Sequence, residues 1–184
     1  MRRDRHRLLT VTVVLVALVT LGAGSSDERV RPARWAKAIC TALSDWAGAI
    51  ATAQRGVDPE EPDLRERRRV LVEYLDSVAG ATRTLLGEFK QAGIPDVDDG
   101  KPIARAFRQG VREARDAFAA AADDVAALQV ADTETFEQGQ NDVYEQIQEA
   151  RGDAAAPFTE VAEKYDTAKL DAAFEKESAC SGSG

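Results

Sequence analysis

The clearest pattern in the chain runs from residue 64 to residue 93, where the sequence reads LRERRRVLVEYLDSVAGATRTLLGEFKQAG. Its apolar side chains recur at steps of three and four, which places them on one face of a helix that only Arg68 interrupts. Gly93 can end this helix in a left-handed conformation, and Pro95 then prevents its continuation. The predicted face comprises Leu64, Leu71, Leu75, Val78, Thr82, Leu85, Phe89 and Ala92. This stretch therefore predicts a long amphipathic helix that buries one side against other elements.

Three more segments show the same period. One begins at Pro32 and another at Pro102, since proline suits the first turn of a helix. The third begins after Asp132, whose carboxylate suits an N-cap. Their apolar faces are Trp35, Ile39, Leu43 beside Ala42, Trp46, Ile50 and Ala53 in the first, Ile103, Phe107, Val111, Ala114, Phe118, Ala121, Val125 and Leu128 in the second, and Phe136, Gln140, Val143, Ile147, Ala150, Ala154, Phe158, Val161 and Tyr165 in the third.

The last of these helices contains a proline. Pro157 cannot donate a hydrogen bond to the carbonyl of Asp153, so the sequence predicts a kink there or a split into two helices. A short helix capped by Asp166 follows, with Leu170 and Phe174 as its apolar residues. After residue 25 no apolar alternation of period two occurs, so no strand is predicted.

The short connections predict that consecutive helices are antiparallel neighbours. The expected fold is all-α, an up-down-up-down four-helix bundle with a short C-terminal helix, spanning residues 26–184 as one domain after an N-terminal signal segment. The alternative is a long antiparallel coiled coil that pairs with another chain. The faces carry more than two apolar residues per heptad, which favours closure within one chain and hence a monomer.

The first 25 residues have the pattern of a secretory signal peptide. Four arginines precede a mostly apolar run from Leu8 to Leu21, and small residues end the segment at Ser25, after which we expect cleavage. The run is shorter than the ~20 residues of a membrane helix, and the alternative is an uncleaved N-terminal membrane anchor. Gly24 stands where a lipoprotein would carry the cysteine to be acylated. The sequence therefore predicts a secreted, extracellular protein with no lipid anchor.

Charge and histidine content exclude several classes of function. With 24 Lys and Arg against 32 Asp and Glu, the formal charge is −8, and loss of residues 1–25, with four Arg and one Asp, makes it −11. Such a charge repels nucleic acid, so we expect no nucleic-acid partner. The only histidine, His6, lies in the signal segment. Histidine triads and histidine metal sites are therefore excluded from the mature chain.

Two cysteines, Cys40 and Cys180, remain after export into an oxidising compartment. An up-down-up-down bundle brings the end of its fourth helix near the start of the first, so the tail can meet Cys40. A bridge closing this loop of 140 residues (180 − 40) would stabilise the fold by about 5 kcal/mol. The alternatives are free thiols or an intermolecular bridge. No Cys-x-x-Cys motif is present, so a redox-active site is not expected.

Two acidic patterns resemble metal sites. From Asp96 onward, an EF-hand register would place Gly at position six and Glu at position twelve, but Lys101 and Phe107 stand there. This loop, with Asp98, Asp99 and Gly100, is instead expected to cap the next helix. A second set, Asp142, Glu145, Glu149 and Asp153, shares a helix face turned away from the apolar one and is expected to be solvated. We predict no catalytic, cofactor-binding or metal-binding residue.

Arginines form two groups. The functional interpretation is a docking surface for an anionic polymer or an acidic partner. Acidic neighbours favour the other interpretation, solvated faces with intrahelical ion pairs such as Arg112 with Asp116. The groups are Arg65, Arg67, Arg68 and Arg69, and Arg105, Arg108, Arg112 and Arg115.

Three segments carry a resemblance to a group of proteins. They are Cys40-x-x-Leu43-x-x-Trp46, the loop Gly93-Ile94-Pro95-Asp96-Val97 with Gly100, and the ending Tyr165-Asp166, Leu170-Asp171 and Cys180. Together they resemble small secreted proteins and lipoproteins of actinobacteria. The resemblance implies a helical exported protein and no established activity.

These patterns favour a non-enzymatic role. We expect a binding or structural module of the cell envelope or the extracellular medium, with a protein partner that the sequence does not identify and no cofactor. The alternative is a carrier of an apolar small molecule, in which alanine-rich faces opposite Phe89, Phe107, Phe118 and Phe136 leave a cavity in the bundle core. A carboxylate-dependent hydrolase is the least favoured hypothesis.

Overall fold

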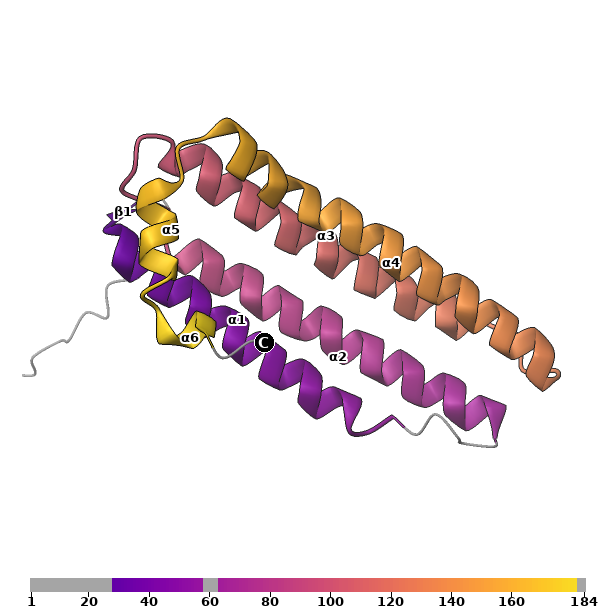
Figure 1. Ribbon diagram of the computed structural model, residues 1–184. Helices are drawn as coiled ribbons and strands as arrows, with labels where there is room; N and C mark the ends of the chain where they lie inside the picture. Colours follow the sequence, from indigo (N-terminus) through magenta and orange to yellow (C-terminus); the bar gives the residue numbers. More distant parts are fainter. Residues whose placement is uncertain (1–27, 58–62, 182–184) are drawn as a thin grey trace, which may run out of the picture.

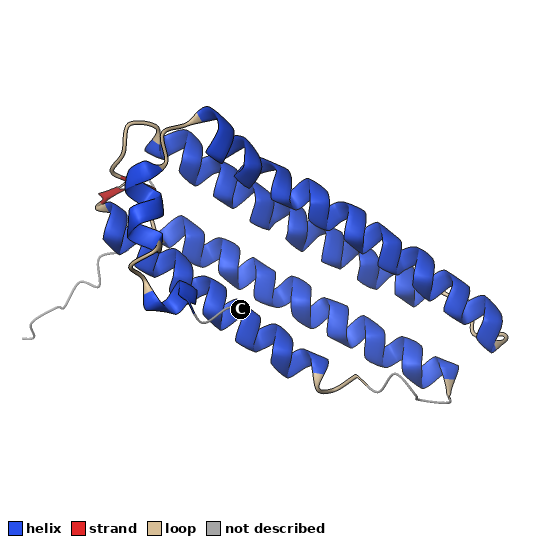
Figure 2. Ribbon diagram, viewed as in Figure 1, coloured by secondary structure: helices blue, strands red, loops and turns tan. Residues whose placement is uncertain are grey.

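The computed structural model describes residues 28–57 and 63–181, so the predicted signal peptide lies outside the described residues. The predicted all-α class is confirmed, because most of the described chain is helical and its one sheet has two short strands (Figure 2). The helices are α1 (Pro32–Gln54), α2 (Leu64–Gln91), α3 (Gly100–Ala127), α4 (Thr133–Lys164), α5 (Ala168–Phe174) and α6 (Ser178–Ser181). In the described part of the chain, no helix is long and apolar enough to cross a membrane.

The long helices form a bundle. Helix α1 packs against α2, α2 against α3, and α3 against α4, while α5 and α6 both contact α1. Figure 1 shows α1 and α2 side by side, α3 and α4 side by side, and α5 lying across the end of the bundle where α1 begins. Segments from the two ends of the sequence are therefore neighbours in space.

A small parallel sheet joins the start of the described chain to the α2–α3 connection. Its strands are β1 (Arg29–Val30) and β2 (Ile94–Pro95), with Arg29 opposite Ile94. The sequence did not predict it, because two residues are too short to show a period. Gly93 has φ +77°, the predicted left-handed conformation, and a Cβ there would lie 2.7 Å from the Glu28 carbonyl oxygen. The glycine thus lets the two backbones approach.

The helix ends match the predicted caps only in part. The Asp132 carboxylate accepts a hydrogen bond from the Thr135 amide at 2.8 Å, as predicted. The predicted acidic cap of the third helix is right in position only, because Asp99 is the N-cap residue of α3 but its side chain makes no hydrogen bond to the helix. Helix α3 begins at Gly100, two residues before Pro102. A Cβ at Gly100 would collide with the Pro95 carbonyl oxygen.

Helix α4 is continuous through Pro157, so the predicted split into two helices is wrong. Pro157 is buried, and the preceding turn packs closely against α3. A Cβ on Gly110 of α3 would lie 2.5 Å from the Ala154 carbonyl oxygen and 2.6 Å from the Phe158 ring. This close approach holds α4 against α3 on both sides of the proline. The Asp166 carboxylate accepts a hydrogen bond from Ala168 at the start of α5, at 3.1 Å.

Two hydrophobic clusters form the core. The first lies at the end where α5 crosses α1, and its buried residues include Trp35, Ile39, Leu85, Phe89, Ile103, Val161 and Leu170. The second lies near the α3–α4 connection and comprises Leu75, Ala121, Ala122, Val125 and Val143. The predicted face of α1 needs one correction. Leu43 is 37% exposed, whereas its neighbour Ala42 is buried in the first cluster.

Candidate functional site

The predicted disulfide is present. Cys40, which is buried in α1, is bonded to Cys180 of α6, and their Cα atoms lie 5.0 Å apart. Of the cysteines in the described chain, none has a free thiol. The bond therefore connects the first long helix to the C-terminal segment across 140 residues of sequence.

Aromatic rings reinforce this end of the bundle. The Trp35 ring of α1 meets the rings of Phe107 and Phe174 edge to face, with centroids 5.1 Å and 5.8 Å away. Phe107 in turn meets Phe158 of α4 at 4.9 Å. Pairwise ring contacts therefore link α1, α3, α4 and α5. They hold in place α3 and α4, the helices on which the candidate sites lie.

The arginine group at the start of α2 makes structural contacts. Arg67 donates to Gln140 of α4 at 3.2 Å, lies 3.7 Å from Glu137, and stacks 5.5 Å from the Phe136 ring centroid. Arg68 donates to the Leu128 carbonyl oxygen at 2.9 Å. The prediction of a solvated face is therefore wrong for these two residues, because both reach across to other elements.

Arg69 of the same group is exposed and pairs within its helix. It bonds to Glu66 and Glu73, one turn away on either side. The hydrogen bond from Arg69 lowers the pKa of Glu66. For this residue the predicted intrahelical pairing is confirmed.

The arginine group on α3 lines a groove. The pocket has a volume of about 400 Å³ and lies where α3 faces the end of α2 and strand β2. Its lining residues are Lys90, Ile94, Lys101, Arg105, Arg108, Gln109 and Arg112, which we call the basic groove. Arg115 is not part of it. The predicted Arg112–Asp116 pair is wrong, because Asp116 accepts from the neighbouring Arg115 at 2.9 Å.

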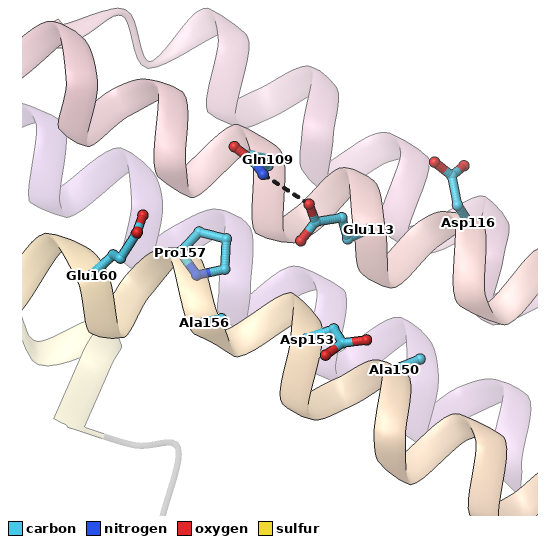
Figure 3. Close-up of a pocket in the computed structure, with 8 residues that line it drawn as sticks. All are labelled: Gln109, Glu113, Asp116, Ala150, Asp153, Ala156, Pro157 and Glu160. Atoms are coloured by element: carbon cyan, nitrogen blue, oxygen red, sulfur yellow. Dashed lines mark hydrogen bonds between the residues drawn. The ribbon is translucent and has the colours of Figure 1, made fainter.

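An acidic groove lies on the neighbouring face of α3. It has a volume of about 560 Å³ and runs between α3 and α4 (Figure 3). Its lining residues are Gln109, Glu113, Asp116, Ala150, Asp153, Ala156, Pro157 and Glu160. Gln109, which lines both grooves, donates to the Glu113 carboxylate at 2.9 Å along α3 (Figure 3). The two grooves are therefore separated by a single ridge of side chains.

The predicted carboxylate set of α4 is divided in the structure. Asp153 lines the acidic groove, whereas Asp142, Glu145 and Glu149 do not. Within residues 28–57 and 63–181, no group of three or more His, Cys, Asp or Glu side chains is placed to hold a metal ion. The acidic groove thus offers negative charge without the convergent ligands of a metal centre.

A third pocket, between α3 and α4, shows how much space an apolar ligand would find there. It is lined by Ala114, Ala117, Phe118, Ile147, Ala150 and Arg151. Its volume of about 10 Å³ is close to the space that one water molecule occupies. This pocket is too small for an apolar small molecule.

The sequence identified the arginines of the basic groove but not its lysines. Lys101 precedes Arg105 by four residues, so the helical period alone could have added it. Lys90 belongs to α2, and only the turn through Gly93 and β2 brings it to α3. No protein-family model, curated protein or solved structure matches the chain.

Proposed function

We propose that this chain is an exported helical-bundle protein that acts as a binding module of the cell envelope or the extracellular medium. The observation that carries the proposal is the Cys40–Cys180 bond, since disulfides persist in oxidising compartments outside the cytoplasm. The basic start and apolar run of residues 1–25 provide independent support from the sequence. The resemblance to secreted actinobacterial proteins is consistent with this proposal.

The binding role is supported by the two grooves along α3. Both have volumes within the range of small-molecule sites, about 300–1,000 Å³. They carry opposite charge on neighbouring faces of one rigid helix, so each would select a different class of ligand. We infer that recognition takes place on α3.

Mass spectrometry of the secreted protein tests the export proposal. The full chain is expressed with its own N-terminus in a bacterial host that has the general secretory pathway. The expected product in the medium begins at Ser26 and is two hydrogens lighter than the reduced form. A chain that stays in the cells with residues 1–25 attached, or that carries two free thiols, would contradict the proposal.

We also propose that the four long helices form a closed up-down-up-down bundle. Support comes from Phe107 of α3, whose ring contacts both Trp35 of α1 and Phe158 of α4, and from Arg67 of α2, which reaches α4. Nuclear Overhauser contacts test the arrangement. We expect cross-peaks from the Phe107 ring to both the Trp35 and the Phe158 rings, and their absence would contradict a closed bundle.

The carrier alternative stays a prediction. It needs an apolar cavity of ligand size, and the pocket beside Phe118 and Ile147 holds about 10 Å³. The grooves that do have room are lined by charged residues. We therefore place the binding function on these grooves rather than in the bundle core.

A further inference from the structure

The basic groove concentrates positive charge on a protein whose formal charge is −8. Of the seven lining residues that the structure describes, five are Lys or Arg and none is Asp or Glu. Four of them, Lys90, Lys101, Arg105 and Arg112, take part in no salt bridge with any residue that the structure describes. Their charge is not neutralised by such pairs, unlike that of Arg67 and Arg69.

Two walls converge at this groove. Lys101, Arg105, Arg108 and Arg112 follow one face of α3 over a length of about 16 Å, given the rise per helical residue. The opposite wall is formed by Lys90 of α2 and by Ile94, which is buried in β2. Gly100 lets the two walls approach, because a side chain at this first residue of α3 would strike the Pro95 carbonyl oxygen of β2.

One arginine is held in place by the helix. Arg108 is half-buried and its Nε donates to the Ala104 carbonyl oxygen at 3.0 Å. Its guanidinium is therefore oriented before a ligand arrives, which lowers the entropy lost on binding. Guanidinium groups match the planar geometry of carboxylate and phosphate oxygens, which they can bind in pairs.

The acidic groove limits the size of the ligand. Among the described residues, Gln109 alone lines both grooves, and Glu113 and Asp116 lie just beyond it on α3. A long polyanion that left the basic groove in this direction would meet these carboxylates within about one Debye length, roughly 8 Å at physiological salt. A compact anion inside the groove is close to the five cations instead.

We propose that the basic groove binds a compact anion with two or more negative charges, such as a phosphate ester or a small polycarboxylate. This inference rests on the proposed binding function and assigns its ligand class. The oxyanion would lie among Arg105, Arg108 and Arg112, with Lys90 and Lys101 as the surrounding positive charges.

The test is a titration of the isotope-labelled, disulfide-bonded chain, followed by backbone amide shifts. The probes are inorganic pyrophosphate, citrate and poly-glutamate at constant ionic strength. We expect saturable shifts at Lys90, Ile94 and residues 101–112 with pyrophosphate or citrate, and the tighter of the two identifies a phosphate or a carboxylate ligand. No saturation with either compact anion would overturn the proposal, and so would saturation by poly-glutamate alone.

A matched pair of double variants separates the groove from net charge. Arg105→Gln with Arg112→Gln removes two cations from the groove, whereas Arg34→Gln with Arg83→Gln removes two exposed cations elsewhere. We expect the first pair to weaken binding about tenfold or more, as loss of a charge-assisted hydrogen bond does, and the second by less than about twofold. Equal weakening by both pairs would overturn the proposal. Export and the mass of the bridged chain are measured separately, so a failure of anion binding is distinguishable from a failure of the proposed export.

Discussion

The two ends of the bundle are stabilised by different interactions. At the bridged end, which contains Cys40–Cys180 and the first hydrophobic cluster, large rings and a covalent bond fix α5 and α6 onto α1. At the far end, which contains the second cluster, the buried residues include Ala121, Ala122 and Val125, and a half-buried Arg67 connects α2 to α4. The small side chains allow α2, α3 and α4 to pack closely, and the arginine adds contacts that alanine cannot provide. Mutations at the two ends should therefore differ in how much they change the free energy of unfolding and in how that change depends on pH.

The largest effect is expected from the disulfide. Replacing Cys40 and Cys180 together by Ala removes a crosslink across 140 residues, which the chain-entropy model values at about 5 kcal/mol. Urea unfolding monitored by circular dichroism measures the loss. A double variant that unfolds at the same urea concentration as the bridged protein would show that the bond adds nothing to the bridged end.

The next largest loss of stability is expected from Trp35→Ala. The ring is 1% exposed and contacts Phe107 and Phe174, so its removal should lower the free energy of unfolding by about 3–5 kcal/mol. Trp35→Phe is the control. It keeps an aromatic ring, and the buried indole N–H has no hydrogen-bond partner in the part of the chain that the structure describes, so no such bond is lost. Thermal unfolding should show a much smaller change for Trp35→Phe, and equal changes would contradict the aromatic role.

At the far end, Arg67→Ala should lower the free energy of unfolding by about 1–2 kcal/mol. It removes the hydrogen bond to Gln140 and the contact with the Phe136 ring. Arg65→Ala is the matched control, because Arg65 is an exposed member of the same arginine group and should change stability by about 0.5 kcal/mol or less. Chemical unfolding compares them. An equal loss in both variants would mean that the far end does not depend on the arginine contact.

Asp132 makes the stability of the far end depend on pH in the acidic range. Hydrogen bonds from the Thr135 amide and hydroxyl lower the pKa of Asp132 in the folded state. Its stabilising contribution is therefore complete above the ordinary pKa of an aspartate and is lost as pH falls through the lowered value. Asp132→Ala should lower the melting temperature at pH 7, and the difference from the parent protein should shrink toward pH 3. A difference that is constant over this range would contradict the capping role.

The smallest effect is expected at Glu88, on the bridged side of α2. Burial, together with the nearby charge of Asp45, raises the pKa of Glu88. Its deprotonation at neutral pH therefore opposes folding, and Glu88→Gln should stabilise the protein at pH 7 by about 0.5 kcal/mol or less. The gain should disappear as pH falls below the ordinary pKa of a glutamate, where Glu88 is neutral in both states. Melting temperatures at pH 7 and pH 3 measure it, and a loss of stability at pH 7 would contradict the assignment.

The sequence predicted the helices well because each has a long apolar period with clear punctuation. Gly93 ended α2 and Asp132 capped α4 as expected, since both act through their own backbone or the next turn. Contacts across elements were less accessible. Arg68 interrupted the apolar face in the sequence, and its partner, the Leu128 carbonyl oxygen, is 60 residues away. Pro157 suggested a break that packing against Gly110 overrides.

For the same reason the sequence placed the arginines of the candidate site on one face of a helix, although it favoured a solvated face with intrahelical ion pairs over a binding site. The period of α3 placed Arg105, Arg108 and Arg112 on one face, and this row lines the basic groove. A sequence pattern does not show whether such a row is paired. The structure places Asp116 with Arg115 rather than with Arg112, and the turn at Gly93 brings Lys90 to the same place. The pairing of Asp116 depends on side-chain rotamers, and the place of Lys90 depends on the connection between two helices. Neither leaves a periodic pattern in the sequence.

Native-state hydrogen exchange, compared between the bridged protein and the Cys40→Ala, Cys180→Ala variant, tests the central claim that the bond ties the C-terminal segment to α1. In α5, the amides of Leu170 and Asp171 are hydrogen-bonded to the Thr167 carbonyl oxygen. We predict that in the variant these two amides lose more protection than those of Leu75 and Val125 at the far end, because α5 and α6 detach first. Equal losses at all four amides would contradict the claim, since the bond would then act only through the unfolded chain.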